Sequence, residues 1–219
     1  MEKLKTKQRI LSLASRAFFK VGFRAMTMDK LAENAGISKK TIYKYFSGKS
    51  HLVRETISMI IDSVFEEQDN YLNRATDPVE QFIYFFIPLF QLWARLGHNQ
   101  VNEIAGQFPE AFEVIDNRRR KRIPILVNIY EEGVKKGYFR PVNCKLLYSF
   151  IQDSVLNFLT PGKLASLGVS PTETIEMLLH IFLFGLVADE KMDVVQSKFS
   201  DLKKILPPPG ETFLFDFID

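Results

Sequence analysis

Residues 27–46 of the chain read TMDKLAENAGISKKTIYKYF. Thr27 and Ser38 are of the types that cap the N-terminus of a helix, and Gly36 between them tolerates the positive φ of a sharp turn. Apolar residues recur at helical spacing behind both caps, at Met28, Leu31, Ala32, Ala35, Ile42 and Phe46. The stretch therefore predicts two short helices joined by a tight turn, which is a helix-turn-helix.

The second of these helices is predicted to present cations and hydroxyl groups on its outer side. At about 100° per residue, Lys40 and Lys44 lie opposite Ile42 and Phe46. The start and flanks of the helix add Lys39, Thr41, Tyr43 and Tyr45. Such side chains suit phosphate oxygens and base edges, so we expect the helix to enter the major groove of DNA. Lys49, at the start of the next helix, is expected to add a phosphate contact.

Positive charge is concentrated in the same part of the chain. The first fifty residues contain twelve lysines and arginines but three acidic residues, whereas the whole chain has a net charge of +3. A basic head on an acidic body points to a polyanionic partner. A helix that is merely solvated is the alternative, but it does not explain why two caps, a glycine turn and a basic surround occur together.

The stretch from about Ile10 to Leu52 resembles the N-terminal domain of the TetR family of bacterial regulators. The matching residues are Ala17-Phe18-Phe19, Gly22-Phe23, Thr27, Leu31-Ala32, Ala35-Gly36-Ile37-Ser38, Thr41-Ile42-Tyr43, Tyr45-Phe46, Lys49 and Leu52. The resemblance implies DNA contacts at Thr27, Lys39, Lys40, Thr41, Tyr43, Tyr45 and Lys49. Two residues depart from the family pattern, since Lys40 stands where glycine is frequent and Ser50 where an acid is frequent. Lys40 adds charge to the reading face and is expected to alter the preferred DNA sequence.

Helical patterns continue beyond the head, so we predict an all-α fold. An N-terminal three-helix helix-turn-helix DNA-binding domain (residues 1–50) is expected to precede a larger helical ligand-binding and dimerisation domain (residues 51–219). Glycine, proline and capping residues delimit the later helices at about 50–72, 76–96, 110–136, 143–160 and 171–188. Pro88 is expected to kink its helix. Residues 161–170 are expected to form a linker, and the proline-rich tail from Pro207 is not helical as written.

The last two predicted helices carry apolar stripes that suit a homodimer. The first helix presents Leu147, Phe150, Ile151, Ser154, Val155, Phe158 and Leu159, and the second presents Ile175, Leu178, Leu179, Phe182, Leu183, Leu186 and Val187. Such stripes can pair with their two-fold mates in a four-helix bundle, and an intramolecular core is the alternative. A dimer is also favoured because two reading helices reach successive major-groove faces of a palindromic site.

Aromatic residues in the larger domain are numerous enough to line a cavity. The resemblance implies a ligand pocket in this domain, and we predict that Phe86, Phe90, Trp93, Phe112, Tyr130 and Phe150 line it. An apolar, aromatic pocket with few polar groups favours a small hydrophobic or aromatic ligand. The alternative is that these rings only fill the core.

Several other classes of protein lack support in the sequence. With Cys144 as the one cysteine and three scattered histidines, neither a disulfide nor a metal site is expected. The most apolar runs are about a dozen residues long, short of the roughly 20 that cross a bilayer, and the charged start does not resemble a signal peptide. We therefore expect a cytoplasmic protein with no membrane or cofactor partner. Dinucleotide, phosphate-loop, serine-hydrolase and zinc-protease motifs are missing, which argues against an enzyme.

The sequence thus predicts a ligand-responsive transcription regulator, expected to be a repressor. As a homodimer it would bind a palindromic operator in double-stranded DNA, and a small hydrophobic molecule would release it by tilting the helix at 50–72. The alternatives are a helix-turn-helix protein-interaction module without ligand response, and an enzyme. The basic run Arg118–Arg122 is expected to be a solvated part of its helix, with DNA, a nucleotide or an acidic partner as the alternatives.

Overall fold

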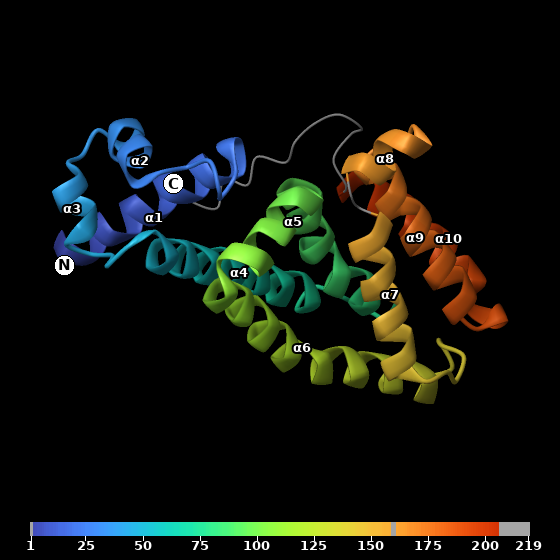
Figure 1. Ribbon diagram of the computed structural model, residues 1–219. Coiled ribbons are helices and arrows are strands. Elements are labelled where there is room, and N and C mark those ends of the chain that lie inside the picture. The colour runs from blue at the N-terminus through green and yellow to red at the C-terminus, as the bar shows by residue number, and fades with distance from the viewer. Residues whose placement is uncertain (1, 159–160, 206–219) are drawn as a thin grey trace. The chain divides into compact units, whose positions relative to one another are not determined.

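The computed structural model describes residues 2–158 and 161–205, and it is all-α across them (Figure 1). Within these residues, strand-like pairing is limited to an antiparallel bridge between Phe139 and Val187. The predicted all-α fold is therefore confirmed. The elements are α1 (Glu2–Val21), α2 (Met28–Ala35), α3 (Lys39–Tyr43), α4 (Lys49–Leu72), α5 (Pro78–Gln107), α6 (Pro109–Lys135), α7 (Cys144–Phe158), α8 (Pro161–Leu167), α9 (Pro171–Leu186), a short 3-10 helix (Asp189–Lys191) and α10 (Met192–Ile205).

The chain forms two compact units. Unit 1 contains the described residues up to Ser63 together with Asn99–Lys121, and unit 2 contains Val64–His98 and the described residues from Arg122 onward. Helices α4, α5 and α6 each contribute one part to unit 1 and another part to unit 2. Residues 2–50 of the predicted DNA-binding head thus lie in unit 1, together with parts of α4, α5 and α6.

Capping side chains start several helices of unit 2. The Asp77 carboxylate accepts hydrogen bonds from the N–H groups of Val79 and Glu80, both at 2.9 Å, at the start of α5. At the start of α9, Ser170 Oγ accepts from the Glu173 N–H at 3.1 Å, and the Glu173 carboxylate accepts from the Ser170 N–H in return.

Among the described residues, no helix is both long and apolar enough to span a membrane.

Two elements differ from the sequence-based expectation. Residues 161–167 form α8 rather than a linker, and Gly168 follows it with a φ of 67°. Helix α10 was not predicted, because its apolar residues are sparse and interrupted by charged ones. Pro88 remains inside the single helix α5. The proline-rich tail from Pro207 lies outside the described residues.

Aromatic rings fill much of the core of unit 2. Phe139, in the segment after α6, is buried against Phe82 at a ring-centroid distance of 5.7 Å and stacks on Tyr130 at 6.1 Å. Backbone hydrogen bonds hold this segment on the end of α9, with the Arg140 N–H donating to the Leu186 carbonyl at 2.8 Å. The extended segment therefore closes the core by placing one ring into it.

Gly133 lets the Phe139 ring approach the backbone of α6, and Gly133→Ala is expected to destabilise the protein. A Cβ at this position would lie 2.2 Å from Phe139 Cδ2. We expect a loss of about 1–3 kcal/mol in the free energy of unfolding, because overpacking a closed core forces strain. Each kcal/mol corresponds to a fall of roughly 2–4 °C in Tm for a chain of this size. In the control Gly106→Ala, where no atom lies within 4 Å of the added Cβ, stability is expected to be kept or raised. Equal melting of both variants would contradict the close packing.

Candidate functional site

The helix-turn-helix forms in unit 1 with the caps and the turn that the sequence predicted. Thr27 Oγ1 accepts a hydrogen bond from the Lys30 N–H at 3.2 Å, and Ser38 Oγ accepts one from the Thr41 N–H at 3.0 Å. Gly36 has a φ of 61°, in the left-handed region that favours glycine. These local features fix the direction in which α3 leaves α2.

An apolar core beneath α3 fixes which of its sides faces solvent. Ile42 and Phe46 are fully buried, as are Phe18 and Phe23, whose rings stack with centroids 4.9 Å apart. Lys7 Nζ lies 5.8 Å from the centroid of the Phe46 ring. Because one side of α3 is held in this core, the opposite side is presented to solvent.

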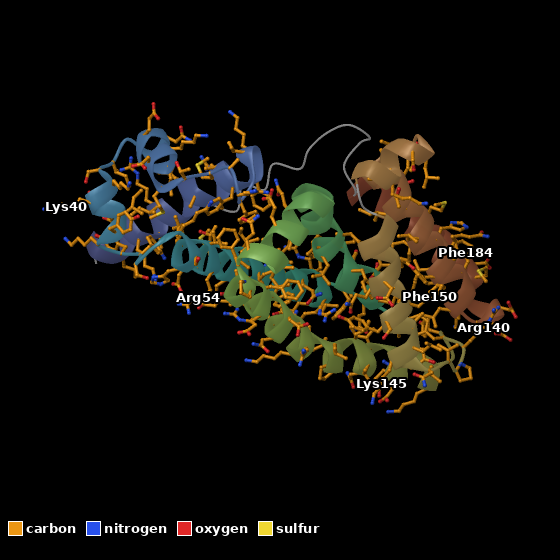
Figure 2. The ribbon with its side chains drawn as sticks, viewed as in Figure 1. Lys40, Arg54, Arg140, Lys145, Phe150 and Phe184 are labelled. Carbon is orange, nitrogen blue, oxygen red and sulfur yellow. The ribbon has the colours of Figure 1, made fainter. Side chains whose placement is uncertain are left out.

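The outer side of α3 carries exposed cations and a phenol. Lys40, Tyr43 and Lys44 are exposed, and Lys40 projects from α3 to the outside of unit 1 (Figure 2). Thr27 is also exposed, while Tyr45 is half-buried. Within the described part of the chain, neither Lys40 nor Lys44 has an ion-pair partner, so both ammonium groups are available to an anionic ligand.

Lys39 and Thr41, at the start of α3, are held by neighbouring side chains. Lys39 Nζ forms an ion pair with the Asp29 carboxylate at 2.8 Å, and this hydrogen bond raises the pKa of Lys39 above its ordinary value. The hydroxyl groups of Thr41 and Ser38 are hydrogen-bonded at 2.8 Å. Both contacts are exposed to solvent and therefore weak enough for DNA to compete with them.

The Lys49 side chain is half-buried, whereas a lysine that only binds phosphate would be exposed. Its Nζ donates a hydrogen bond to the Arg24 carbonyl at 2.9 Å and lies 5.5 Å from the centroid of the Phe108 ring. Burial lowers the pKa of Lys49, and the Glu103 carboxylate opposes this shift. Lys49 therefore braces the loop after α1, in addition to being a candidate phosphate contact.

The C-terminal part of α5 touches α1 and the loop that follows it within unit 1, which the sequence did not predict. Gln100 Nε2 donates to the Phe19 carbonyl at 3.1 Å, and the Glu103 carboxylate accepts from the Arg24 N–H at 3.1 Å. We expected the helix to end near residue 96, whereas α5 continues to Gln107. A helix with its first part in unit 2 thus has its last part in contact with α1 and the loop that leads to the helix-turn-helix.

The basic run Arg118–Arg122 is held by acidic side chains and is not simply solvated. Arg118 also donates to Ser58 Oγ at 3.2 Å, and the Arg122 guanidinium lies 5.0 Å from the centroid of the Phe65 ring. These contacts fasten α6 to α4 inside each unit. The ion-pair partners are Asp62 for Arg118, Asp116 for Arg119 and Arg120, and Asp69 for Arg122.

Three of the residues predicted to line a ligand pocket lie in the core of unit 2. Phe86 and Phe90 stack with centroids 5.6 Å apart, and both are buried. Tyr130 belongs to the same core, and its hydroxyl donates to the Val142 carbonyl at 2.8 Å. Phe86, Phe90 and Tyr130 are therefore the predicted residues that the structure places in one core.

Of the other three predicted pocket residues, two lie elsewhere. Phe112 belongs to unit 1 and is exposed. Phe150 is exposed on α7, where its ring makes an edge contact with Phe182 at 5.8 Å. The side chain of Trp93 lies outside the described residues.

The apolar stripe predicted on α9 as a dimer face is buried within the chain, so the prediction was wrong for these residues, which form an intramolecular core. Different apolar side chains are exposed: Leu146 (69%) and Phe150 (62%) on α7, and Met177 (52%) and Ile181 (57%) on α9. Helices α7 and α9 pack side by side, and Phe150 and Phe184 mark them in Figure 2. The buried stripe consists of Ile175, Leu178, Leu179, Phe182, Leu183, Leu186 and Val187.

An exposed, basic reading helix on a helix-turn-helix, followed by a larger helical part, defines a DNA-binding transcription regulator. Residues 10–56 match the family model of the bacterial regulatory proteins of the tetR family. The repressor KstR2 of Mycolicibacterium smegmatis is 29% identical over 154 residues, which cover 66% of this chain and 73% of that protein. The chain therefore carries the N-terminal DNA-binding domain of the TetR family, and its relatives in sequence and fold support a TetR-family transcriptional regulator.

Solved structures share the fold of this chain. The ketosteroid transcriptional regulator KstR2 of Mycobacterium tuberculosis superposes with a TM-score of 0.60 at 25% identity, covering 84% of this chain and 95% of that one. A regulator from Saccharomonospora viridis in complex with choline has a TM-score of 0.72 at 17% identity, covering 84% and 98%. The relatives that match in sequence are named as transcriptional regulators and not as enzymes, in agreement with the prediction.

Proposed function

We propose that the chain is a ligand-responsive repressor that binds a palindromic operator as a homodimer and is released by a small, hydrophobic molecule. The observation that carries the DNA-binding part is the outer side of α3, where Lys40 and Lys44 are exposed and have no ion-pair partner in the described chain. Since such a regulator acts where the chromosome lies, we assign it to the cytoplasm.

The proposed DNA contacts combine base reading with phosphate binding. Lys39 and Thr41 at the start of α3 are assigned to base edges, because the N-terminal residues of a recognition helix reach deepest into the groove. The remaining residues are assigned to phosphates, or to bases through the longer lysines. The full set is Thr27, Lys39, Lys40, Thr41, Tyr43, Lys44, Tyr45 and Lys49.

The proposed homodimer uses the exposed apolar side chains of α7 and α9. Leu146 and Phe150 are one turn apart on α7, and Met177 and Ile181 are one turn apart on α9. Two adjacent helices with an apolar outer face can pair with their two-fold copies as a four-helix bundle. Exposed apolar patches of this kind mark interaction surfaces more often than single exposed residues do.

The proposed effector site lies in the aromatic core of unit 2, with Phe86, Phe90 and Tyr130 as candidate wall residues and Trp93, Phe112 and Phe150 left as sequence-based candidates. Coupling to DNA is proposed to run along α4 and α5, because each has a part in both units. A ligand that repacks α4 or α5 in unit 2 would shift the population of DNA-competent dimers. One relative is named a ketosteroid regulator and another neighbour is in complex with choline, and these two molecules differ in chemistry. The class of effector must therefore be inferred from this chain's own residues.

Selection of bound sequences from a random duplex pool tests the proposed function. We expect the selected DNA to contain a palindrome, and affinity for random duplex to fall steeply as the salt concentration rises. A protein-interaction module or an enzyme would show little binding to either DNA. Gel shifts on the selected operator then show whether a candidate effector lowers affinity.

Single alanine variants of the head are expected to separate base reading from phosphate binding. Lys49→Ala should weaken binding to specific and random DNA alike. It should also make the salt dependence shallower, decreasing the magnitude of the slope of log affinity against log salt by about one per lost phosphate contact. Lys39→Ala and Thr41→Ala should change the preferred sequence instead, because they are assigned to base edges. The measurement is operator selection and salt titration for each variant. Identical losses for all three on both DNAs would contradict the division of roles.

A further inference from the structure

A polar cluster lies between α4 and α5, beside the aromatic core of unit 2. The Gln91 side chain lies close to the Tyr71 hydroxyl, and the Tyr71 ring centroid lies 5.3 Å from that of Tyr84. Glu67 precedes Tyr71 by one turn of α4. Burial raises the pKa of Tyr71, and the nearby Glu67 charge raises it further. Glu67, Tyr71 and Gln91 therefore form one group, which we call the α4–α5 polar cluster.

Two oxygen atoms of this cluster are buried without a hydrogen-bond partner, namely Glu67 Oε2 and Gln91 Oε1. Gln91 is only 4% exposed, so bulk water does not reach its amide. Burial raises the pKa of Glu67, and no cationic side chain contributes to that shift. Buried acceptors that lack a donor are costly, so a native protein retains them where something else binds.

Gln68, the next residue on α4, shows that the fold can satisfy a buried amide at this depth. Gln68 is fully buried, yet its Nε2 donates to the Phe85 carbonyl and its Oε1 accepts from Arg122 Nε at 2.6 Å. Helix α4 thus pairs the buried amide of Gln68 at both ends, whereas Glu67 Oε2 on α4 and Gln91 Oε1 on α5 are left open. The acceptors without a donor belong to Glu67 and Gln91, the two residues that neighbour Tyr71.

The chemistry of the missing partner follows from these groups. Gln91 Oε1 can only accept a hydrogen bond, and the Glu67 carboxylate favours a positive charge. The rings of Tyr71 and Tyr84 add faces that attract a cation. We propose that the α4–α5 polar cluster is the polar end of the effector site and takes a ligand with a protonated amine on an apolar body. This rests on the proposed function, whose effector it assigns to a chemical class.

Isothermal titration calorimetry with three matched probes tests the proposal. The probes are 4-phenylbutylamine, 4-phenylbutanol and 4-phenylbutyrate, which share a body and differ in the charge of the head group. We expect the full-length protein to bind the amine at least about 10-fold more tightly than the alcohol or the carboxylate, since a charge-assisted hydrogen bond is about twice as strong as a neutral one. Equal affinities for amine and alcohol, or failure to bind the amine, would overturn the proposal.

Two variants and a control show whether the cluster itself makes the selection. Glu67→Gln should remove the preference for the amine, and Gln91→Leu should reduce it. Glu66→Gln, which changes an exposed carboxylate on the same helix, should leave it unchanged. An undiminished preference in Glu67→Gln would overturn the assignment. That variant is also expected to melt at a higher temperature than the wild type without ligand, because a buried carboxylate oxygen without a donor has been replaced, and this confirms that it folds.

Gel shifts on the selected operator separate this inference from the proposed function. If the wild type binds its operator but shows no amine preference, the effector class is wrong and the regulator function stands. If the wild type binds no DNA at all, the proposed function fails whatever the calorimetry shows.

Discussion

Ile181→Glu is expected to convert the proposed dimer into a monomer and to lower its affinity for a two-half-site operator by about 10²–10⁴-fold, the advantage that linkage of two binding modules provides. Ile181 is exposed on α9 and is one of the four residues of the apolar face formed by α7 and α9. In a two-fold bundle, each glutamate would be desolvated and would face the apolar residues of the other copy, and a buried charge without a partner is strongly unfavourable. Affinity for a single half-site should not change, because α3 lies in unit 1 and is untouched.

Light scattering at several protein concentrations gives the oligomeric state, and gel shifts with one-half-site and two-half-site duplexes give the affinities. Leu4→Glu is the matched control, since Leu4 is an equally exposed apolar residue (62%) on α1 in unit 1. The control should remain dimeric. A dimeric Ile181→Glu protein with wild-type affinity for the full operator would show that this face is not the interface.

The helix-turn-helix was predictable because its determinants are local. Thr27, Gly36 and Ser38 act on backbone groups within four residues of themselves, so their roles are visible in a short window of sequence. The same reasoning missed α10, in which the periodic apolar residues Val195, Phe199 and Leu202 are separated by charged ones. Only packing against α9 distinguishes such a helix from a solvated segment.

The dimer face shows a different limit. Helix α9 is apolar on nearly all sides, so its periodicity indicates a buried helix without indicating which side the rest of the chain covers. Leu179 and Leu183 turn out to be covered by this chain, while Met177 and Ile181 are left exposed. The choice between them depends on tertiary contacts that a single helical pattern does not contain.

Of the α4–α5 polar cluster, the sequence indicates Gln91 as a buried polar residue but does not indicate Glu67. Gln91 interrupts the apolar run that begins at Phe82, and a lone amide in such a run signals a buried polar group. Glu67, in contrast, follows Glu66 and precedes Gln68, so it gives the pattern of an ordinary solvated helix face. That Tyr71, one turn after Glu67, meets Gln91 appears only when α4 and α5 are packed together.

The double variant Lys40→Ala/Lys44→Ala is expected to lower affinity for DNA of any sequence by about 100-fold or more at moderate salt. Each protomer would lose two cations that have no ion-pair partner in the described chain, so a dimer would lose four. Affinity falls as salt rises, and each phosphate contact contributes roughly 0.9 to the magnitude of the slope of log affinity against log salt. The magnitude of that slope should therefore decrease by up to about four. Fluorescence anisotropy on operator and random duplexes across a salt series measures both quantities.

Arg120→Ala/Lys121→Ala is the matched control for this double variant, because it removes two exposed cations from α6 and causes the same change in net charge. Arg120 is paired with Asp116 and neither residue belongs to the helix-turn-helix, so the control should keep both the affinity and the salt slope of the wild type. If the two double variants lost affinity equally, overall charge would govern binding and α3 would not be the reading element. If only the α3 variant lost it, the positions of Lys40 and Lys44, and not the charge of the chain, would account for binding.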